Sequence, residues 1–149
     1  NNSKKEQEMT KNMLSIKKCI KRGAATTLLL LAAITIQADN VMKRHADGTC
    51  SVNTRIICKA RGYRKGTPVE VYFKNGKVLK VVALKNEETV PYFARIKKFL
   101  LPLYNNLKVS KAKKLAERTD IDGCTGATFS TKAVQKNIQT AIGYYEKNK

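Results

Sequence analysis

The stretch TPVEVYFKNGKVLKVVAL, residues 67–84, constrains the fold of this chain more than any other. Before Asn75-Gly76 apolar residues alternate with polar ones, and this period of two predicts a strand with one buried face. Asn75 and Gly76 both tolerate a positive φ, so they favour the tight turn of a hairpin that leads into a second strand. The apolar positions that carry the pattern are Val69, Val71, Phe73, Val78, Val81 and Val82.

A further strand is expected at residues 54–60, TRIICKA, and three antiparallel strands need helices to cover one face. Helical spacing of apolar residues predicts helices in residues 91–107 and 130–149. Residues 110–120 are a candidate for another short helix, with mostly solvated basic side chains. Pro102 should bend or end the first helix, and Ser130 is a natural N-cap for the last. The predicted fold is therefore α+β: a single domain with a small, hairpin-containing antiparallel sheet packed against two or three helices. The expected helical stripes comprise Phe93, Ile96, Phe99, Leu100 and Leu103, and then Ala133, Val134, Ile138, Ala141, Ile142 and Tyr145.

The first 38 residues have the pattern of a secretory signal. Lysine and arginine precede the apolar stretch GAATTLLLLAAITI, residues 23–36, and the small residue Ala38 stands before a plausible cleavage point at Asp39. The apolar stretch is shorter than the roughly 20 residues that span a bilayer. We therefore expect residues 1–38 to be an N-terminal extension and signal peptide, with an uncleaved anchor as the alternative. Residues 39–149 should then form one domain that is exported to the periplasm or the extracytoplasmic membrane face.

The balance of charges is strongly basic, and it favours anionic partners. The formal net charge is +19, and residues 39–149 keep 23 Lys and Arg against 9 Asp and Glu. Phosphates, acidic membrane surfaces, nucleic acid and acidic proteins all fit such a charge. Residues 39–149 also contain Cys50, Cys58 and Cys124. An oxidising compartment would permit one disulfide among these three, and their spacing leaves the pairing open.

The segment DGCTGATFS, residues 122–130, places small and hydroxyl-bearing residues just before the last predicted helix. The first turn of a helix has unpaired N–H groups and the positive end of the helix dipole, which together bind phosphate. Gly126 permits a close approach of the backbone, and Ala127 adds little bulk. The residues alone thus indicate either a phosphate site or a simple helix cap. The hydroxyl groups come from Thr125, Thr128 and Ser130.

The motif DGCTGAT resembles the flavin-attachment motif of the FMN-binding domain family. This family includes the C subunit of the sodium-translocating NADH:quinone reductase and the G subunit of the Rnf electron-transport complex. Its pattern is an Asp, two variable residues, Ser or Thr, and then Gly-Ala-Thr. The resemblance extends through ADGTC, the hairpin, EETVPYF and the closing helix, from about residue 46 to the C-terminus. Every fixed position of the motif is matched, by Asp122, Thr125, Gly126, Ala127 and Thr128.

The resemblance implies that a flavin transferase joins FMN, through its phosphate, to Thr128 as a phosphoester. The other motif residues would form the surrounding recognition sequence, and Phe129 and Ser130 would lie beside the cofactor. Glu88 and Thr89 are weaker candidates for flavin contacts, because this chain departs from the family near them. Tyr92 follows Pro91 where relatives often have Gly, and the segment between DGTC and RGY is longer than usual. The implied cofactor-binding residues are Thr128, Asp122, Thr125, Gly126, Ala127, Phe129, Ser130, Glu88 and Thr89.

Together with the secretory pattern of residues 1–38, the resemblance implies an exported electron carrier rather than a complete enzyme, because no substrate-handling domain is recognised in the chain. Its partners would be the flavin transferase, a membrane-bound electron donor and an extracytoplasmic redox partner, with peripheral membrane association as an option. The alternative is a basic exported binding module for nucleic acid or another polyanion, although a signal peptide argues against nucleic acid. His45 is the only histidine, with no zinc-ligand spacing, and nothing orients it toward Cys124 as a catalytic pair. No metal site and no catalytic residue are therefore predicted. The aromatic residues that suggest the alternative are Tyr63, Tyr72, Phe73 and Tyr92.

Overall fold

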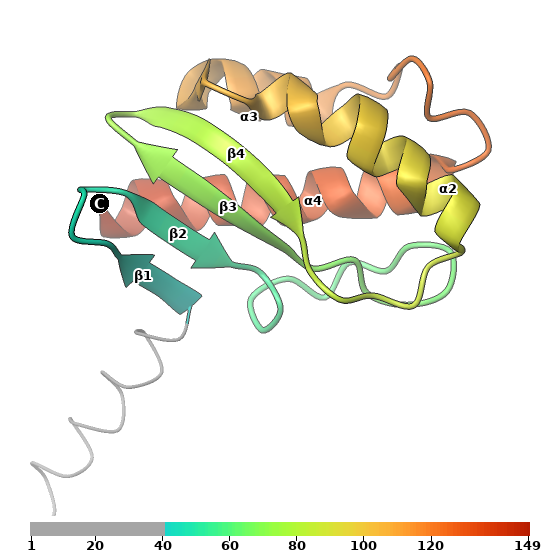
Figure 1. The fold of residues 1–149 in the computed structure, drawn as a ribbon, viewed down its shortest axis with the longest axis horizontal. Coiled ribbons are helices and arrows are strands. Elements are labelled where there is room, and N and C mark those ends of the chain that lie inside the picture. Colours follow the sequence, from blue (N-terminus) through green and yellow to red (C-terminus); the bar gives the residue numbers. More distant parts are fainter. Residues whose placement is uncertain (1–40) are drawn as a thin grey trace, which may run out of the picture. The chain divides into compact units, whose positions relative to one another are not determined.

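The computed structural model describes residues 41–149, so the signal peptide or anchor predicted for residues 1–38 lies outside the described residues. Its centre is an antiparallel sheet of five strands in the order β1-β2-β3-β4-β5 (Figure 1). No helix in residues 41–149 has both the length and the hydropathy to cross a bilayer. The strands are β1 (Met42–Arg44), β2 (Cys50–Asn53), β3 (Val69–Lys74), β4 (Lys77–Ala83) and β5 (Leu107–Lys108).

The predicted hairpin is confirmed as β3 and β4, joined at Asn75 and Gly76. These two residues have φ values of 50° and 71°, as expected for a tight turn that follows the twist of the strands. The inward residues Val69, Val71 and Phe73 are completely buried. Alternation of side chains along β3 therefore supplies one wall of the hydrophobic core.

The strand predicted for residues 54–60 is wrong, because the chain leaves the sheet at Thr54. The Thr54 hydroxyl donates to the Val69 carbonyl at 3.0 Å and accepts from the Val69 N–H at 2.9 Å. The Cys58 N–H then bonds the Thr54 carbonyl at 3.0 Å and closes a turn. The strand that pairs with β3 is instead β2, immediately before this turn.

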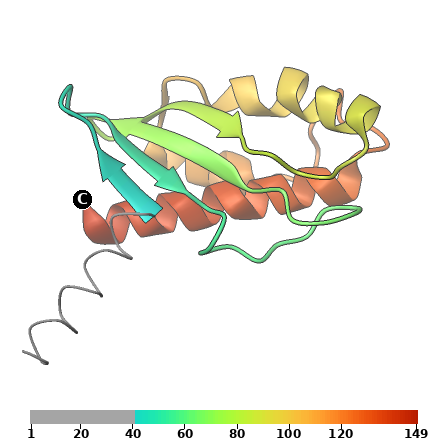
Figure 2. The same ribbon diagram turned by 60° about the horizontal axis from the view of Figure 1, so that its bottom comes forward.

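Helix α4 (Thr128–Asn148) runs along one face of the sheet, and its predicted apolar stripe is confirmed (Figures 1 and 2). The ring of Tyr145 stacks on that of Phe73, with centroids 4.2 Å apart and an interplanar angle of 4°. Helix α3 (Val109–Glu117) packs beside α4 and corresponds to the predicted second helix. The α+β fold class inferred from the sequence is thus confirmed. The stripe residues buried in the core are Ala133, Val134, Ile138, Ala141, Ile142 and Tyr145.

The helix predicted for residues 91–107 is broken into three short pieces. Helix α2 (Val90–Arg95) passes into a π-helical turn, η1 (Ile96–Leu100), and then into a 3₁₀ turn, η2 (Leu101–Tyr104). A π turn holds an extra residue, so the buried stripe is displaced along the sequence. Phe99 and Leu103, predicted to be in the core, are 40% and 48% exposed, while Leu101 and Tyr104 are buried in their place.

Candidate functional site

Thr128 is the first residue of α4, and it is exposed. The N-cap is Ala127, which has no side chain able to accept a hydrogen bond, and no side chain caps this helix within the described residues. The prediction of Ser130 as the N-cap is wrong, because α4 starts two residues earlier and Ser130 lies buried in its first turn. The first N–H groups of a 21-residue helix therefore remain available beside the Thr128 hydroxyl.

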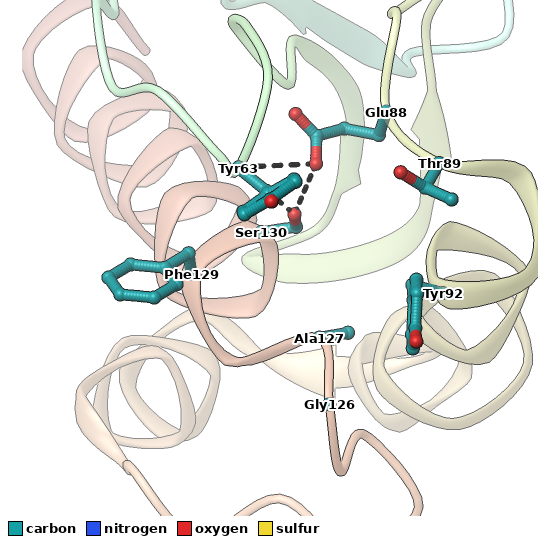
Figure 3. A pocket seen from close by; sticks show the side chains of 8 residues that line it. All are labelled: Tyr63, Glu88, Thr89, Tyr92, Gly126, Ala127, Phe129 and Ser130. Carbon is teal, nitrogen blue, oxygen red and sulfur yellow. Dashed lines mark hydrogen bonds between the residues drawn. The ribbon is translucent and has the colours of Figure 1, made fainter.

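A hollow with a volume of about 260 Å³ opens beside the first turn of α4 (Figure 3). We call it the aromatic hollow, because Tyr63, Tyr92 and Phe129 are among its lining residues. In Figure 3 the side chains of Tyr63 and Tyr92 stand on different sides of it, while the Phe129 ring points outward. These rings are 75%, 47% and 71% exposed, which is unusual for large aromatic side chains in a small domain. The remaining lining residues are Glu88, Thr89, Gly126, Ala127 and Ser130.

Glu88 holds one wall of the aromatic hollow in place. Its side chain is only 8% exposed, and its carboxylate accepts hydrogen bonds from the backbone of the 63–65 loop and from the Ser130 hydroxyl (Figure 3). The backbone N–H distances are 3.2 Å from Tyr63, 2.9 Å from Arg64 and 3.1 Å from Lys65. Gly62 completes this arrangement, since a Cβ there would stand 2.8 Å from a Glu88 oxygen. Loop, carboxylate and helix thus form one connected unit.

Burial raises the pKa of Glu88, but hydrogen bonds from Ser130 and from three backbone N–H groups outweigh it and hold this pKa below its usual value. A carboxyl with a lower pKa in the folded state stabilises the fold above its unfolded pKa of about 4.3. That stabilisation is lost as the pH falls through the folded value.

We therefore expect Glu88→Gln to lower the free energy of unfolding by about 1–3 kcal/mol at pH 7, because an amide cannot accept all four bonds. The difference from the wild type should shrink as the pH falls below 4, since the wild-type carboxyl is then protonated as well. Urea unfolding at a series of pH values measures this. Glu117→Gln is the control, because Glu117 is exposed and has no hydrogen-bond or ion-pair partner within residues 41–149. An equal loss in both variants at pH 7 would contradict the role given to Glu88.

The loop before α4 is held by side chains from α2 and η1. Gly123 and Gly126 have φ values of 79° and 84°, and a Cβ on each would stand 2.6 Å from the Phe99 ring and 3.2 Å from the Tyr92 ring. Nη1 of Arg95 donates to the Thr125 carbonyl at 2.5 Å. The two glycines are therefore required both for their backbone conformation and for close packing against aromatic rings.

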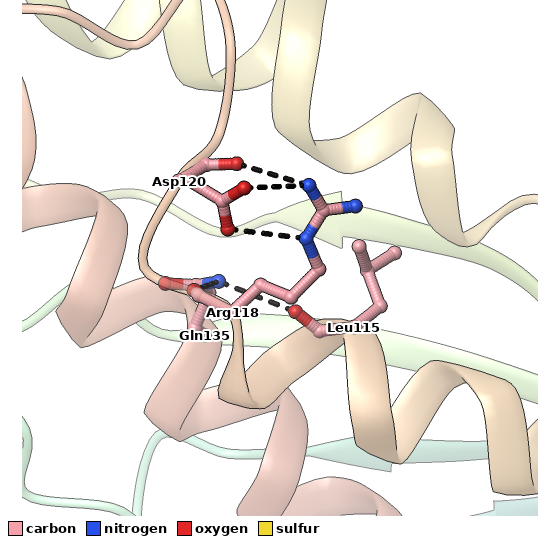
Figure 4. Close-up of polar contacts among 4 residues, drawn as sticks. All are labelled: Leu115, Arg118, Asp120 and Gln135. Carbon is pink, nitrogen blue, oxygen red and sulfur yellow. Dashed lines mark hydrogen bonds and ion pairs between the residues drawn. The ribbon is translucent and has the colours of Figure 1, made fainter.

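The other end of this loop is fixed to α3 and α4 (Figure 4). Arg118 makes a two-point contact with the Asp120 carboxylate, at 3.2 Å from Nε and 2.8 Å from Nη2. Nε2 of the buried Gln135, on α4, donates to the Arg118 carbonyl at 2.7 Å and to the Leu115 carbonyl at 3.4 Å. These bonds satisfy carbonyl groups at the end of α3 and set where the loop begins.

Thr128 itself lines a second hollow, of about 300 Å³, on the other side of the first turn. We call it the threonine hollow, because Thr125 and Thr131 also line it. Lys132 lies one helical turn after Thr128, on the same face, and contributes a positive charge. Asp122 lines this hollow too, and its carboxylate has no hydrogen-bond or ion-pair partner in the part of the chain that the structure describes.

The residues that the sequence singled out thus fall into two groups. One group lines the aromatic hollow: Glu88, Thr89, Gly126, Ala127, Phe129 and Ser130. The other lines the threonine hollow: Asp122, Thr125 and Thr128. The local pattern gave no signal for the support that Arg95 and Phe99 give the loop, because both appeared as ordinary residues of a helix. Tyr63 and Tyr92 were noticed as aromatic residues, but not as walls of a common hollow.

The three cysteines of residues 39–149 are free thiols in the structure. Burial raises the pKa of the Cys124 thiol, which disfavours its thiolate form. His45 instead contacts the Ser51 hydroxyl, at 3.2 Å from Nε2, in the connection between β1 and β2. Among residues 41–149, the side-chain partner of His45 is thus Ser51 rather than Cys124.

The comparison with known protein families gives one match. The model of the FMN-binding domain matches residues 62–143, which is more than half of the chain. This range includes the hairpin, Glu88, both hollows and most of α4. No curated protein and no solved structure matches the chain.

Proposed function

The chain belongs to the FMN-binding domain family, and from this premise we propose that it is an exported electron carrier that holds FMN as a phosphoester on Thr128. Flavin binding follows from the family itself. The covalent bond, the export and the transfer of electrons are the parts that we propose. One observation carries the proposal: the exposed Thr128 begins a long helix that has no side-chain cap, and it lines the threonine hollow while its neighbours Ala127 and Phe129 line the aromatic hollow.

The residues around Thr128 fit both halves of such a cofactor. The free N–H groups of the first turn of α4 and the ammonium group of Lys132 suit a phosphate that retains negative charge after esterification. The aromatic hollow suits a planar ring system, since Tyr63 and Tyr92 line it and Gly126 permits a close approach of the backbone. When bound, FMN would supply one- and two-electron transfer, which unmodified side chains do not easily provide.

The protein's own residues would then position the flavin ring and shield it from water. Glu88 and Ser130 fix the wall that carries Tyr63, while α2 carries Tyr92 on the other side. A rigid wall keeps a bound ring in one orientation and excludes water from one of its faces. The Lys and Arg excess of residues 39–149 would favour acidic surfaces on the redox partners.

A separate flavin transferase is proposed to attach the cofactor. A threonine hydroxyl is a poor nucleophile without a neighbouring base, and within residues 41–149 no side chain accepts a hydrogen bond from Thr128. Asp122 is exposed and has no partner there, so its carboxylate is free to be recognised by another protein. Export is supported by the secretory pattern of residues 1–38.

Peptide mapping tests the proposal directly. Trypsin should release residues 119–132 as one segment, because Arg118 precedes it and Lys132 ends it. In protein made together with a flavin transferase, we expect this segment to gain the mass of FMN less one water, and fragmentation should assign the gain to Thr128. Residues 133–136, which contain no hydroxyl group, serve as an internal control. A segment 119–132 that is always unmodified would exclude the covalent carrier.

A further inference from the structure

The outer edge of β4 is largely unpaired (Figure 1). Strand β5 is short and pairs only with Lys77 and Val78, at the start of β4. Beyond this point the sheet has no strand on that side in residues 41–149. The second half of β4 therefore has backbone groups that face away from β3 without a neighbouring strand.

The hydrogen bonds of β3 and of the residue after β4 show which backbone groups of β4 face outward. Val69 is the register partner of Ala83, but the N–H and C=O of Val69 both bond Thr54 on the other side. Leu84, the next residue, donates its N–H to Pro68 at 3.0 Å. Because bonding directions alternate along an antiparallel strand, the N–H and C=O groups of Ala83 and Val81 point to the open edge.

Space is available next to these groups. A hollow of about 380 Å³ runs between Lys80–Ala83 and the facing residues Leu101 and Pro102. A second hollow of about 300 Å³, beside Phe93 and Ala94, shares Ala83 and Lys97 with the first. Together they form a continuous depression along the strand, which we call the β4 groove. Its floor is mostly apolar, so it suits a chain that buries side chains on one face.

The β4 groove carries positive charge. Lys80, Lys85 and Lys97 line it, and none of them has an ion-pair partner among the described residues. The ammonium group of Lys97 stands 5.7 Å from the ring centre of Phe93, which also lines the groove, whereas that of Lys80 is turned toward β3 and stands 4.7 Å from the Tyr72 ring centre. The one acidic residue in the lining is Glu88, and its carboxylate is already bonded to three backbone N–H groups and Ser130.

We propose that the β4 groove binds an extended, acidic segment of a partner protein, which pairs with β4 as an added strand. The outward groups of Val81 and Ala83 would form the backbone hydrogen bonds, and Lys85 and Lys97 would bind carboxylates. Glu88 lines both this groove and the aromatic hollow, so the bound segment lies next to the candidate flavin site. That the partner exchanges electrons rests on the proposed function. The groove and its positive charge are observed independently of the proposed function.

The test uses the full chain and a synthetic peptide of about ten residues, close to the length of a long strand, in which Glu and Val alternate. A second peptide of the same sequence is N-methylated at every backbone nitrogen, so it keeps its charge but neither of its edges can donate the hydrogen bonds of a strand. In NMR titrations we expect the first peptide to bind, to shift the Val81 and Ala83 amide signals and to slow their exchange with solvent. The N-methylated peptide should bind roughly tenfold more weakly or worse.

Protein variants separate the groove from general attraction to a basic surface. Lys97→Glu should weaken binding of the first peptide by about tenfold, because it introduces like charge inside the groove. Lys111→Glu, on the exposed side of α3, makes the same change of charge and should weaken binding less than about twofold. Ala83→Pro should abolish binding while the fold is kept, since it removes an N–H that β3 does not use.

Several results would overturn the proposal. Equal binding of both peptides, or equal losses in Lys97→Glu and Lys111→Glu, would show charge attraction alone. If vesicles of anionic phosphatidylglycerol slow amide exchange at Val81 and Ala83 and the peptide does not bind, the groove binds a membrane surface instead. If Ala83→Pro does not fold, the N-methylated peptide still decides the question. Thr128→Val should bind the peptide as the wild type does, so failure of the flavin proposal is distinguishable from failure here.

Discussion

Thr128→Val protein, made together with a flavin transferase, should show no fluorescent band after denaturation and electrophoresis, whereas the wild type fluoresces under ultraviolet light. Valine keeps the β-branched shape of threonine and removes only the hydroxyl, so the first turn of α4 should form normally. The expected loss is complete, because no other atom of the side chain can form the phosphoester.

Thr140→Val is the matched control for this prediction. Thr140 lies on the same helix, and its hydroxyl donates only to the Lys136 carbonyl at 2.9 Å. The Thr140→Val band should fluoresce as strongly as the wild type. A fluorescent Thr128→Val band would show that FMN is attached to another residue. If the wild-type and Thr140→Val bands are both dark, the transferase reaction itself has failed.

Gly123→Ala should be the most destabilising small substitution in the loop before α4. Gly123 has a φ of 79°, and an added Cβ would stand 2.6 Å from the base of the Phe99 ring. The left-handed backbone costs an alanine about 1–2 kcal/mol, and the steric overlap adds about 1–3 kcal/mol. Urea unfolding measures the sum as a lower midpoint.

Gly48→Ala separates the two costs. Gly48 has nearly the same φ, 80°, but an added Cβ there meets nothing within 4 Å. We therefore expect only the backbone cost of about 1–2 kcal/mol. Combining each variant with Phe99→Ala gives a double-mutant cycle. In the Phe99→Ala background, Gly123→Ala should cost less free energy of unfolding, whereas the cost of Gly48→Ala should be unchanged. Equal penalties at both glycines would show that Phe99 does not restrict the loop.

The sequence predicted those parts of the fold that depend on neighbouring residues. The Asn75-Gly76 turn fixes its own hairpin, and the apolar stripe of the last helix needs no information from elsewhere. The third strand was misplaced because Thr54 uses its hydroxyl on Val69, fifteen residues away. The π turn of residues 96–100 was missed because helical spacing assumes a regular turn.

The candidate site, like the fold, could be predicted where its residues are adjacent in the sequence and not where they are distant. The motif identified Thr128 and its neighbours, because those residues are adjacent in the sequence. The wall opposite them depends on Glu88, which joins backbone groups 23–25 residues earlier to Ser130, 42 residues later. No local pattern reports such contacts. They explain why Glu88 and Thr89, the weaker candidates in the sequence, lie in the aromatic hollow.

The length of α4 also sets the distance between Thr128 and the other end of the helix. Its 21 residues span roughly 30 Å, with Thr128 at one pole. At the opposite pole, Nη2 of Arg44, at the end of β1, donates to the Asn148 carbonyl at 2.7 Å. The candidate attachment residue Thr128 and the Arg44 contact of β1 therefore lie at opposite ends of α4, separated by nearly the full length of the helix.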